Sequence, residues 1–349
     1  MKFNTRRLSA LAAVAATATL SLTACGSSNS AAGNGGGNTG GSSASGTTVT
    51  FIPKNLGNPY FDASDKDGGQ KAVAEFKGKY QEVGPDTATP DGQVSFINTA
   101  AQQGVKALVI SADDPKAPCS AIKQAMSAGT KVVTFDSDTS ADCRNVFVSQ
   151  ASAEGIAKTQ VDQIAKQIGD SGEIAILSAS ANATNQNAWI DLMKKDLAAN
   201  HPNIKLDDVV YGNDDDQTSF DKTAALLQDH PNLKGIISPT TVGIAAAARY
   251  LDTSSAKGKV ALTGLGTPNQ MRKYVQDGTV TSFALWNPSD LGYLAAYTAK
   301  ALVDGKITGK EGDTFTAGKL GEYKVGADGT VLLGDPTVFD KSNIGQFNF

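Results

Sequence analysis

From Thr48 onward, short apolar runs alternate with longer amphipathic segments, and this alternation leaves few possible folds. The first apolar runs cover 49–53, 80–83, 105–110 and 131–135. Helical patterns stand between them, at 60–76 and in segments that open at Thr89 and Asp114. Such alternation is typical of a parallel sheet with helices on both faces. The pattern restarts after Gln150, so we predict an α/β protein with two doubly wound parallel-sheet lobes joined by a hinge.

The length of the chain agrees with two lobes. About 300 residues follow Thr48, which is more than one ordinary hydrophobic core holds. We expect lobe 1 to hold residues 48–149 plus 288–312, and lobe 2 to hold residues 150–287 plus 313–349. Ligands of doubly wound sheets bind outside the carboxyl ends of the strands. Two facing lobes therefore predict a cleft that closes by a hinge.

The first 24 residues predict export. A basic start precedes an apolar run from Leu8 to Leu22, and small residues follow, as in a secretory signal peptide. The run is too short to cross a bilayer comfortably, which needs about 20 residues. The segment Leu22-Thr23-Ala24-Cys25 resembles the bacterial lipoprotein signal. This resemblance implies that residues 1–24 are removed and Cys25 is lipidated. An ordinary signal peptide with an incidental cysteine, or a short membrane anchor, is the alternative.

Residues 25–47 predict an anchor cysteine followed by a flexible tether. Residues 26–47 are almost all Gly, Ser, Asn, Ala and Thr, a composition that cannot bury enough apolar surface to become ordered. A tether of about 22 residues has a root-mean-square reach of about 25 Å. We therefore expect an extracytoplasmic domain, held at the cell membrane as a lipoprotein.

Charge and cysteine content exclude some partners and predict one cross-link. The formal net charge of −4 argues against nucleic acid as a partner. With Cys25 assigned to the lipid, Cys119 and Cys143 predict a disulfide in an exported chain. Closing a loop of about 24 residues stabilises by about 3 kcal/mol in the chain-entropy model. A metal site is the weaker alternative, because no histidine lies nearby.

Polar and aromatic residues follow the predicted strands of both lobes, where a cleft would lie. Aromatic rings stack on the C–H faces of sugars, amides bridge neighbouring hydroxyls, and carboxylates accept hydroxyl protons strongly. Taken singly, these residues could be solvated turns, helix caps or core residues. Together they favour a polar, neutral ligand. The candidate ligand-binding residues are Lys54, Asn55, Asn58, Tyr60, Phe61, Asp136, Asp138, Asn185, Gln186, Trp189, Pro239, Thr241, Leu265, Trp286 and Asn287.

The sequence offers little for catalysis, so we expect no enzyme, no catalytic residue, no cofactor and no metal. His201 and His230 both stand in His-Pro-Asn turns at predicted helix ends. The sequence contains neither a Gly-x-Ser-x-Gly elbow nor a Walker loop. The run 214–216 of three aspartates lacks the spacing of an EF-hand and is interpreted as a solvated helix start.

These strand-end residues carry a resemblance. The chain resembles type I periplasmic sugar-binding proteins over Thr48–Phe349, and the segment 58–61 is similar to the stacking motif of the ribose-binding group. Within the family, the rhamnose-binding receptors match best, at 54–58, 183–190, 239–244 and 285–288. The resemblance implies capture of a sugar between the lobes and delivery to an ABC permease driven by a cytoplasmic ATPase. We expect the receptor to be a monomer.

A sister group, the autoinducer-2 receptors, resembles the chain at 51–54, 136–139, 143–144 and 267–269. That group holds its ligand with a Lys, an Asp, an Asp-Gln pair and a Pro-x-Ala, and the matching residues here are Lys54, Asp136, Gln186 and Pro239. Asn185 replaces the second Asp, and Thr241 replaces the Ala. Both changes favour L-rhamnose or a close deoxysugar.

Three other functions are the alternatives to sugar uptake. An autoinducer-2 receptor for uptake or signalling would share the fold. A sugar-responsive transcription regulator would need a DNA-binding helix pair, which residues 26–47 cannot form. A sugar isomerase would need the acids, bases or metal ligands that the sequence largely lacks.

Overall fold

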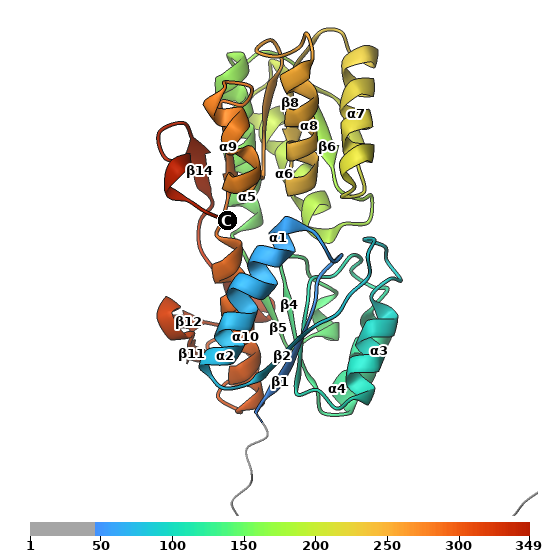
Figure 1. Ribbon diagram of the computed structural model, residues 1–349, viewed down its shortest axis with the longest axis vertical. Coiled ribbons are helices and arrows are strands. Elements are labelled where there is room, and N and C mark those ends of the chain that lie inside the picture. Colours follow the sequence, from blue (N-terminus) through green and yellow to red (C-terminus); the bar gives the residue numbers. More distant parts are fainter. Residues whose placement is uncertain (1–45) are drawn as a thin grey trace, which may run out of the picture. The chain divides into compact units, whose positions relative to one another are not determined.

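The computed structural model describes residues 46–349, and two parallel sheets organise them (Figure 1). The first sheet has the order β13-β5-β4-β3-β1-β2, and every neighbouring pair in it is parallel. The second has the order β7-β6-β8-β9, again all parallel. The strands of the first sheet are β1 (Thr48–Ile52), β2 (Lys79–Glu82), β3 (Ala107–Ile110), β4 (Lys131–Phe135), β5 (Val146–Ser149) and β13 (Thr330–Leu332). Those of the second are β6 (Gly172–Ser178), β7 (Ile204–Tyr211), β8 (Leu233–Ser238) and β9 (Ala261–Gly264). The predicted α/β fold with two parallel-sheet lobes is confirmed.

Helices cover both faces of the first sheet. One face packs against α10 and the segment α1–η1–α2, the other against α3 and α4. These helices are α1 (Pro59–Phe61), the π-helix η1 (Asp62–Gln70), α2 (Lys71–Glu75), α3 (Val94–Gln102), α4 (Cys119–Ser127) and α10 (Pro288–Val303). Alternate residues of β3 pack on opposite faces of the sheet, since Val109 belongs to one core cluster and Leu108 to the other. Burial on both faces explains why the strands read as continuous apolar runs.

Two glycines let η1 approach α10 closely. A Cβ on Gly68 would lie 2.1 Å from the carbonyl oxygen of Ser289, and one on Gly292 would lie 1.9 Å from that of Ser64. No other residue type fits at such a contact. This packing joins the helical segment that begins with Tyr60 to the helix that follows Trp286.

The second sheet is also covered on both faces. Helices α5 and α6 contact each other on one side, and α7 and α8 on the other. A bridge between Leu265 and Ala284 places β10 beside β9, and β14 pairs antiparallel with β10. The elements are α5 (Ala153–Ile168), α6 (Thr184–Asn200), α7 (Asp216–Asp229), α8 (Thr241–Thr253), α9 (Pro268–Gln276), β10 (Ser282–Leu285), β14 (Thr337–Asp340) and η5 (Ile344–Gln346).

The C-terminal segment divides between the lobes, which corrects one expected boundary. Residues 313–349 were expected wholly in lobe 2, but β13 pairs with β5 in the first sheet, and β11 contacts α10. Only the part from β14 onward pairs with the second lobe. Like β13, the other elements between α10 and β14 are too short to show a periodic pattern: β11 (Thr314–Thr316), η3 (Gly318–Leu320), β12 (Glu322–Lys324) and η4 (Ala327–Gly329).

The sequence pattern also missed strand β5 and helix α9, and it opened α3 and α4 too early. Turns precede both α3 and α4. Asp114 Oδ1 accepts hydrogen bonds from the backbone N–H groups of Lys116 (2.7 Å) and Ala117 (2.8 Å) before α4 begins. Before α3, Gln93 Nε2 donates to the carbonyl oxygens of Pro53 (2.9 Å) and Ser111 (2.7 Å). The side chain of Gln93 thus joins the ends of β1 and β3.

The predicted disulfide between Cys119 and Cys143 is confirmed, and it joins the start of α4 to the short 3₁₀ helix η2 (Ala141–Cys143). Cys25 and the predicted signal peptide lie outside the described residues. Within residues 46–349, no helix combines the length and apolar character needed to span a membrane.

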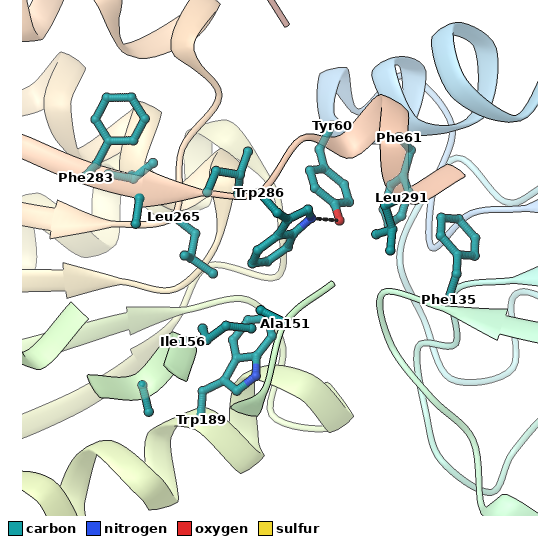
Figure 2. Close-up of a cluster of buried hydrophobic side chains, with 14 of the residues drawn as sticks. Tyr60, Phe61, Phe135, Ala151, Ile156, Trp189, Leu265, Phe283, Trp286 and Leu291 are labelled. Carbon is teal, nitrogen blue, oxygen red and sulfur yellow. Dashed lines mark hydrogen bonds between the residues drawn. The ribbon is translucent and has the colours of Figure 1, made fainter. Parts of the chain in front are cut away.

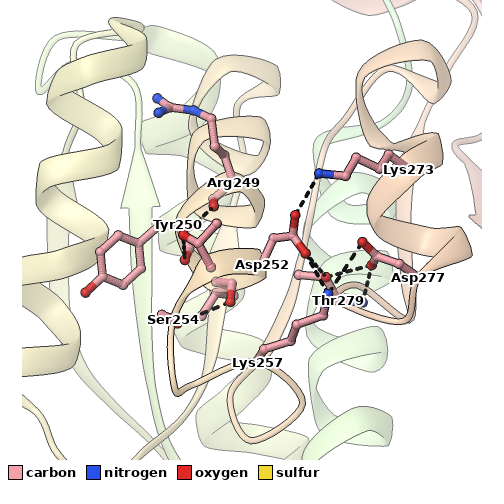
Figure 3. A network of polar contacts seen from close by, with 10 residues as sticks. Arg249, Tyr250, Asp252, Ser254, Lys257, Lys273, Asp277 and Thr279 are labelled. Atoms are coloured by element: carbon pink, nitrogen blue, oxygen red, sulfur yellow. Dashed lines mark hydrogen bonds and ion pairs between the residues drawn. The ribbon is translucent and has the colours of Figure 1, made fainter.

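A polar network ties α8 to α9 at the C-terminal end of α8 (Figure 3). Asp252 accepts hydrogen bonds from Lys257 Nζ (2.6 Å), Lys273 Nζ (2.7 Å) and Thr279 Oγ1 (3.4 Å). The two ammonium groups hold the pKa of Asp252 well below its ordinary value. These charges connect secondary-structure elements, so we assign them a structural role.

Candidate ligand-binding site

A cavity lies between the two lobes, where the strands of both sheets end. It encloses about 360 Å³ of space outside protein atoms, open solvent at its mouth included. Lys54 follows β1, Asp136 follows β4, Pro239 follows β8 and Trp286 follows β10. The full lining is Lys54, Asn58, Tyr60, Phe61, Asp136, Gln186, Trp189, Asp214, Pro239, Thr240, Thr241, Leu265, Leu285 and Trp286.

Three aromatic rings form a continuous apolar wall (Figure 2). The rings of Tyr60 and Trp286 meet edge to face, with centroids 6.1 Å apart and an interplanar angle of 89°. Trp189 and Trp286 have the same separation at an angle of 62°. Trp286 Nε1 donates a hydrogen bond to the Tyr60 hydroxyl (2.9 Å), which fixes both side chains. Such a wall offers ring faces to the C–H groups of a ligand.

The carboxylate of Asp136 is held in the cavity by hydrogen bonds to both of its oxygens. Its Oδ1 accepts from the Tyr60 hydroxyl (3.0 Å), and its Oδ2 accepts from Ser111 Oγ (2.7 Å). Burial raises the pKa of Asp136, while the Lys54 ammonium and these two hydrogen bonds oppose the rise. Its backbone is left-handed (φ 60°), a strained conformation for a residue with a Cβ, and such strain concentrates at binding sites.

Lys54 and Asn185 connect the two lobes. Lys54 is only 2% exposed, and its Nζ donates to Asn185 Oδ1 across 3.1 Å. Asn185 Nδ2 donates in turn to the carbonyl oxygen of Asp136 (3.4 Å). An ammonium has three protons to donate, so Lys54 retains capacity for a ligand. Asn185 stands at the first turn of α6, where it reaches across to lobe 1.

Gln186 presents a buried acceptor to the cavity. Its Nε2 donates to the carbonyl oxygen of Pro239 (3.4 Å), but nothing among the described residues hydrogen-bonds its buried Oε1. A buried polar atom without a partner costs about 1–3 kcal/mol. The oxygen is therefore suited to a hydroxyl donor on a ligand.

A further carboxyl, Asp113, is buried at the end of β3. It is 4% exposed, and its Oδ2 has no partner among the described residues. Burial raises the pKa of Asp113 to about 8; the Lys54 ammonium lowers it, and the Asp214 carboxylate adds to the rise.

Most of the predicted ligand residues line the cavity, but some lie elsewhere. Asp138 pairs with Arg144 instead (2.7 Å), whose side chain is 3% exposed. Asn287 caps α10, where its side chain accepts from the backbone N–H of Ser289 (3.0 Å). Asn55 lies at the mouth of the cleft, and Asn185 reaches the site through Lys54.

Three lining residues were missed from the sequence: Asp214, Thr240 and Leu285. Thr240 Oγ1 donates a hydrogen bond to Asp214. Of the aspartate run, Asp215 is the N-cap of α7, accepting from the backbone N–H of Thr218 (2.7 Å). Asp214 could have been found, because it follows the end of β7 as the predicted residues follow their own strands.

One group outside the cavity has the composition of a metal site. Ligand atoms of Asp162, Asp196 and His201 lie within 4.8 Å of one another. Lys158 Nζ, however, donates to both oxygens of Asp162 (2.8 and 2.9 Å). We therefore interpret the group as part of a surface ion-pair network.

Comparisons with known proteins agree with this geometry. The protein-family model of the periplasmic binding protein domain matches residues 49–307 of this chain. The structure of a sugar ABC transporter from Actinomyces odontolyticus ATCC 17982 is 52% identical, with a TM-score of 0.71, and the match covers 87% of this chain and 98% of that one. An ABC transporter solute binding protein from Clostridium phytofermentas with bound L-rhamnose is 40% identical, with a TM-score of 0.84 over 86% and 98% of the two chains. LsrB from Clostridium saccharobutylicum in complex with AI-2 is 28% identical, with a TM-score of 0.80 over 86% and 100%.

The family match and these identities settle the class of protein. The relatives are binding proteins of transporters, so the expectation that this chain is not an enzyme is confirmed by its family. The predicted resemblance to type I periplasmic sugar-binding proteins is confirmed as well. The chain belongs to the periplasmic binding protein family, as the extracytoplasmic substrate-binding component of a sugar ABC transporter.

Proposed function

We propose that this chain is a lipid-anchored receptor that binds L-rhamnose, or a close deoxysugar, between its two lobes. The observation that carries the proposal is the pairing of an aromatic wall with hydrogen-bonding groups from both lobes in one buried cavity. A relative that is 40% identical over 86% of this chain holds L-rhamnose, which supports the choice of sugar.

The two sides of the cavity suit the two sides of a deoxysugar. A 6-deoxyhexose has a methyl group and C–H faces, which gain free energy when they leave water for the rings of Trp189 and Trp286. Its hydroxyls can donate to Asp136 and to Gln186 Oε1 and can accept from Lys54. Hydrogen bonds to ionised groups are stronger than neutral ones, above all where water is excluded.

Autoinducer-2 is the second candidate ligand. It is supported by the 28% identity to LsrB with bound AI-2 and by the match at Lys54, Asp136, Gln186 and Pro239. We favour rhamnose because Asn185 stands where that group carries a carboxylate, and because Thr241 adds bulk and a hydroxyl to the cavity wall.

The membrane anchor is a separate part of the proposal and rests on the sequence around Cys25. Mass spectrometry of the mature chain from membranes should find residues 1–24 removed and a lipid on Cys25. The Cys25→Ser chain should be recovered unlipidated. An unmodified Cys25 in the membrane fraction would contradict the proposed lipid anchor and would leave the ligand assignment unaffected.

The proposed partners are an ABC permease and its ATPase, and we propose that the receptor acts as a monomer. Deleting this chain from its host should abolish uptake of labelled L-rhamnose, and restoring it should rescue uptake. Light scattering of the purified mature chain should give the mass of one copy, with and without sugar.

A thermal-shift screen with L-rhamnose, L-fucose, D-ribose, D-xylose and autoinducer-2 tests the ligand. A ligand at 100 times its dissociation constant should stabilise the protein by about 2.7 kcal/mol, which gives a clear shift. We expect the largest shift with L-rhamnose. A shift with autoinducer-2 alone would replace rhamnose by the second candidate.

A further inference from the structure

A second, larger cavity adjoins the ligand cavity at the mouth of the cleft. It encloses about 710 Å³ outside protein atoms, against about 360 Å³ for the inner one, open solvent included in both. Asn58 and Asp214 line both cavities, so the two are neighbours with a common wall. The outer cavity is lined by residues of both lobes: Asn55, Gly57, Asn58, Pro59, Asp86, Thr87, Ala88, Asn213, Asp214, Asp215, Asp216, Val242, Ala245 and Gln270.

The outer cavity differs from the inner one in chemistry. Amides, carboxylates and a hydroxyl line it together with small apolar side chains, and among the described residues no aromatic ring does. Asn55 is one of its lining residues, and the side-chain oxygen Oδ1 of Asn55 is buried with no hydrogen-bond partner among the described residues. A buried amide oxygen without a partner is costly, so it points to a donor that a ligand supplies.

The charges of the outer cavity select the kind of group that fits. Asp86 and the run 214–216 are acidic, and no basic residue within 46–349 contributes to the lining. An anionic substituent, such as a uronate or a phosphate, would be repelled there. A neutral group rich in hydroxyls would find acceptors on both sides.

We propose that the outer cavity is a second sugar subsite, and that the receptor takes up neutral rhamnosides, with the deoxysugar inside and the attached sugar against Asn55. This inference rests on the proposed function, because it assumes that the inner cavity holds the deoxysugar. The attached sugar lies between Asn55 of lobe 1 and Ala245 of α8 in lobe 2.

Calorimetry on the full mature chain tests the subsite with three probes: L-rhamnose, methyl α-L-rhamnoside, and a disaccharide in which the rhamnose anomeric carbon carries a neutral hexose. The methyl glycoside controls for blocking of the anomeric hydroxyl. We expect the disaccharide to bind at least fivefold more tightly than the methyl glycoside. Asn55→Ala and Ala245→Phe, the second of which fills the outer cavity, should each remove that gain. Ala245→Phe should also leave L-rhamnose affinity within twofold.

Asn232→Ala, which removes an exposed amide of lobe 2, is the matched control and should keep the gain. If L-rhamnose binds but the disaccharide gains nothing or is excluded, the subsite is wrong and the proposed function stands. A gain that survives in both Asn55→Ala and Ala245→Phe also overturns the subsite. If none of the three probes binds, both the subsite and the proposed function are wrong.

Discussion

The ammonium of Lys54, at the end of the first strand of lobe 1, donates a hydrogen bond to the amide oxygen of Asn185 in lobe 2 across 3.1 Å. Both side chains are buried. The contact therefore joins the lobes at the ligand cavity, and Asn185 also donates to the backbone of Asp136. The identity of residue 185 thus affects closure and ligand choice together.

Asn185→Asp should weaken L-rhamnose binding at least tenfold, which corresponds to about 1.4 kcal/mol. The new carboxylate would pair with Lys54 and place a negative charge beside Asp136, and the donor to the Asp136 backbone would be lost. Calorimetric titration measures the change. Asn232→Asp makes the same charge change on the exposed surface of lobe 2 and should leave the affinity within twofold. Equal affinities of the wild type, Asn185→Asp and Asn232→Asp for L-rhamnose would show that residue 185 does not contribute to ligand binding.

Asp136→Asn and Asp138→Asn should have opposite consequences, although the two residues are near neighbours in sequence. Asp136→Asn should weaken rhamnose binding at least tenfold, because the cavity loses its carboxylate acceptor. Asp138→Asn should leave affinity within twofold but cost about 3 kcal/mol of stability, because the buried Arg144 loses its ionic partner. Calorimetry and urea unfolding separate the two effects. Loss of binding in Asp138→Asn alone would reverse the assignment.

Reduction of the Cys119–Cys143 disulfide should lower the free energy of unfolding by about 3 kcal/mol, given its sequence separation of 24. Neither cysteine lines the ligand cavity, so affinity for L-rhamnose should not change. Urea unfolding with and without reductant measures the loss. The double variant Cys119→Ser/Cys143→Ser should be insensitive to reductant. A large loss of affinity on reduction would mean that the bond supports the site.

The stability of the protein should depend on pH through Asp113. Its pKa is about 8 in the folded protein and about 3.9 in an unfolded chain. Below pH ~4 both states are protonated; above it the unfolded state releases the proton first, so this group destabilises folding by up to about 1.4 kcal/mol per pH unit until pH ~8. The advantage of Asp113→Asn over the wild type should therefore grow from pH 5 to pH 8.

Urea unfolding of Asp113→Asn at several pH values measures this slope. Asp114→Asn, which removes the carboxyl group of the next residue, is the neighbouring control. Parallel pH curves for the wild type and Asp113→Asn would show that Asp113 ionises normally in the folded state.

The position of the cavity could be predicted from sequence because it depends on topology alone. In parallel sheets every carboxyl end meets at one edge, so Lys54, Asp136 and Trp286 were found as residues that follow strands. The same reasoning, applied to β7, would have included Asp214.

Side-chain roles within those loops could not be predicted, because they depend on backbone conformation and distant partners. Asp136 lines the cavity while held in a left-handed conformation, and Asp138 is held by Arg144. Arg144 in turn donates to the carbonyl oxygen of Asp328 (2.7 Å), beside a strand too short to recognise from its sequence.

The chain carries two tryptophans, and both Trp189 and Trp286 line the ligand cavity. A fluorescence titration with L-rhamnose therefore reports directly on the proposed site. We predict a saturable change in tryptophan emission with a dissociation constant of about 1 µM or below, some 8 kcal/mol of binding free energy, and a titration at least tenfold weaker in Asp136→Asn. A flat response to millimolar L-rhamnose, together with saturation by another of the screened ligands, would contradict the assignment of this receptor to rhamnose.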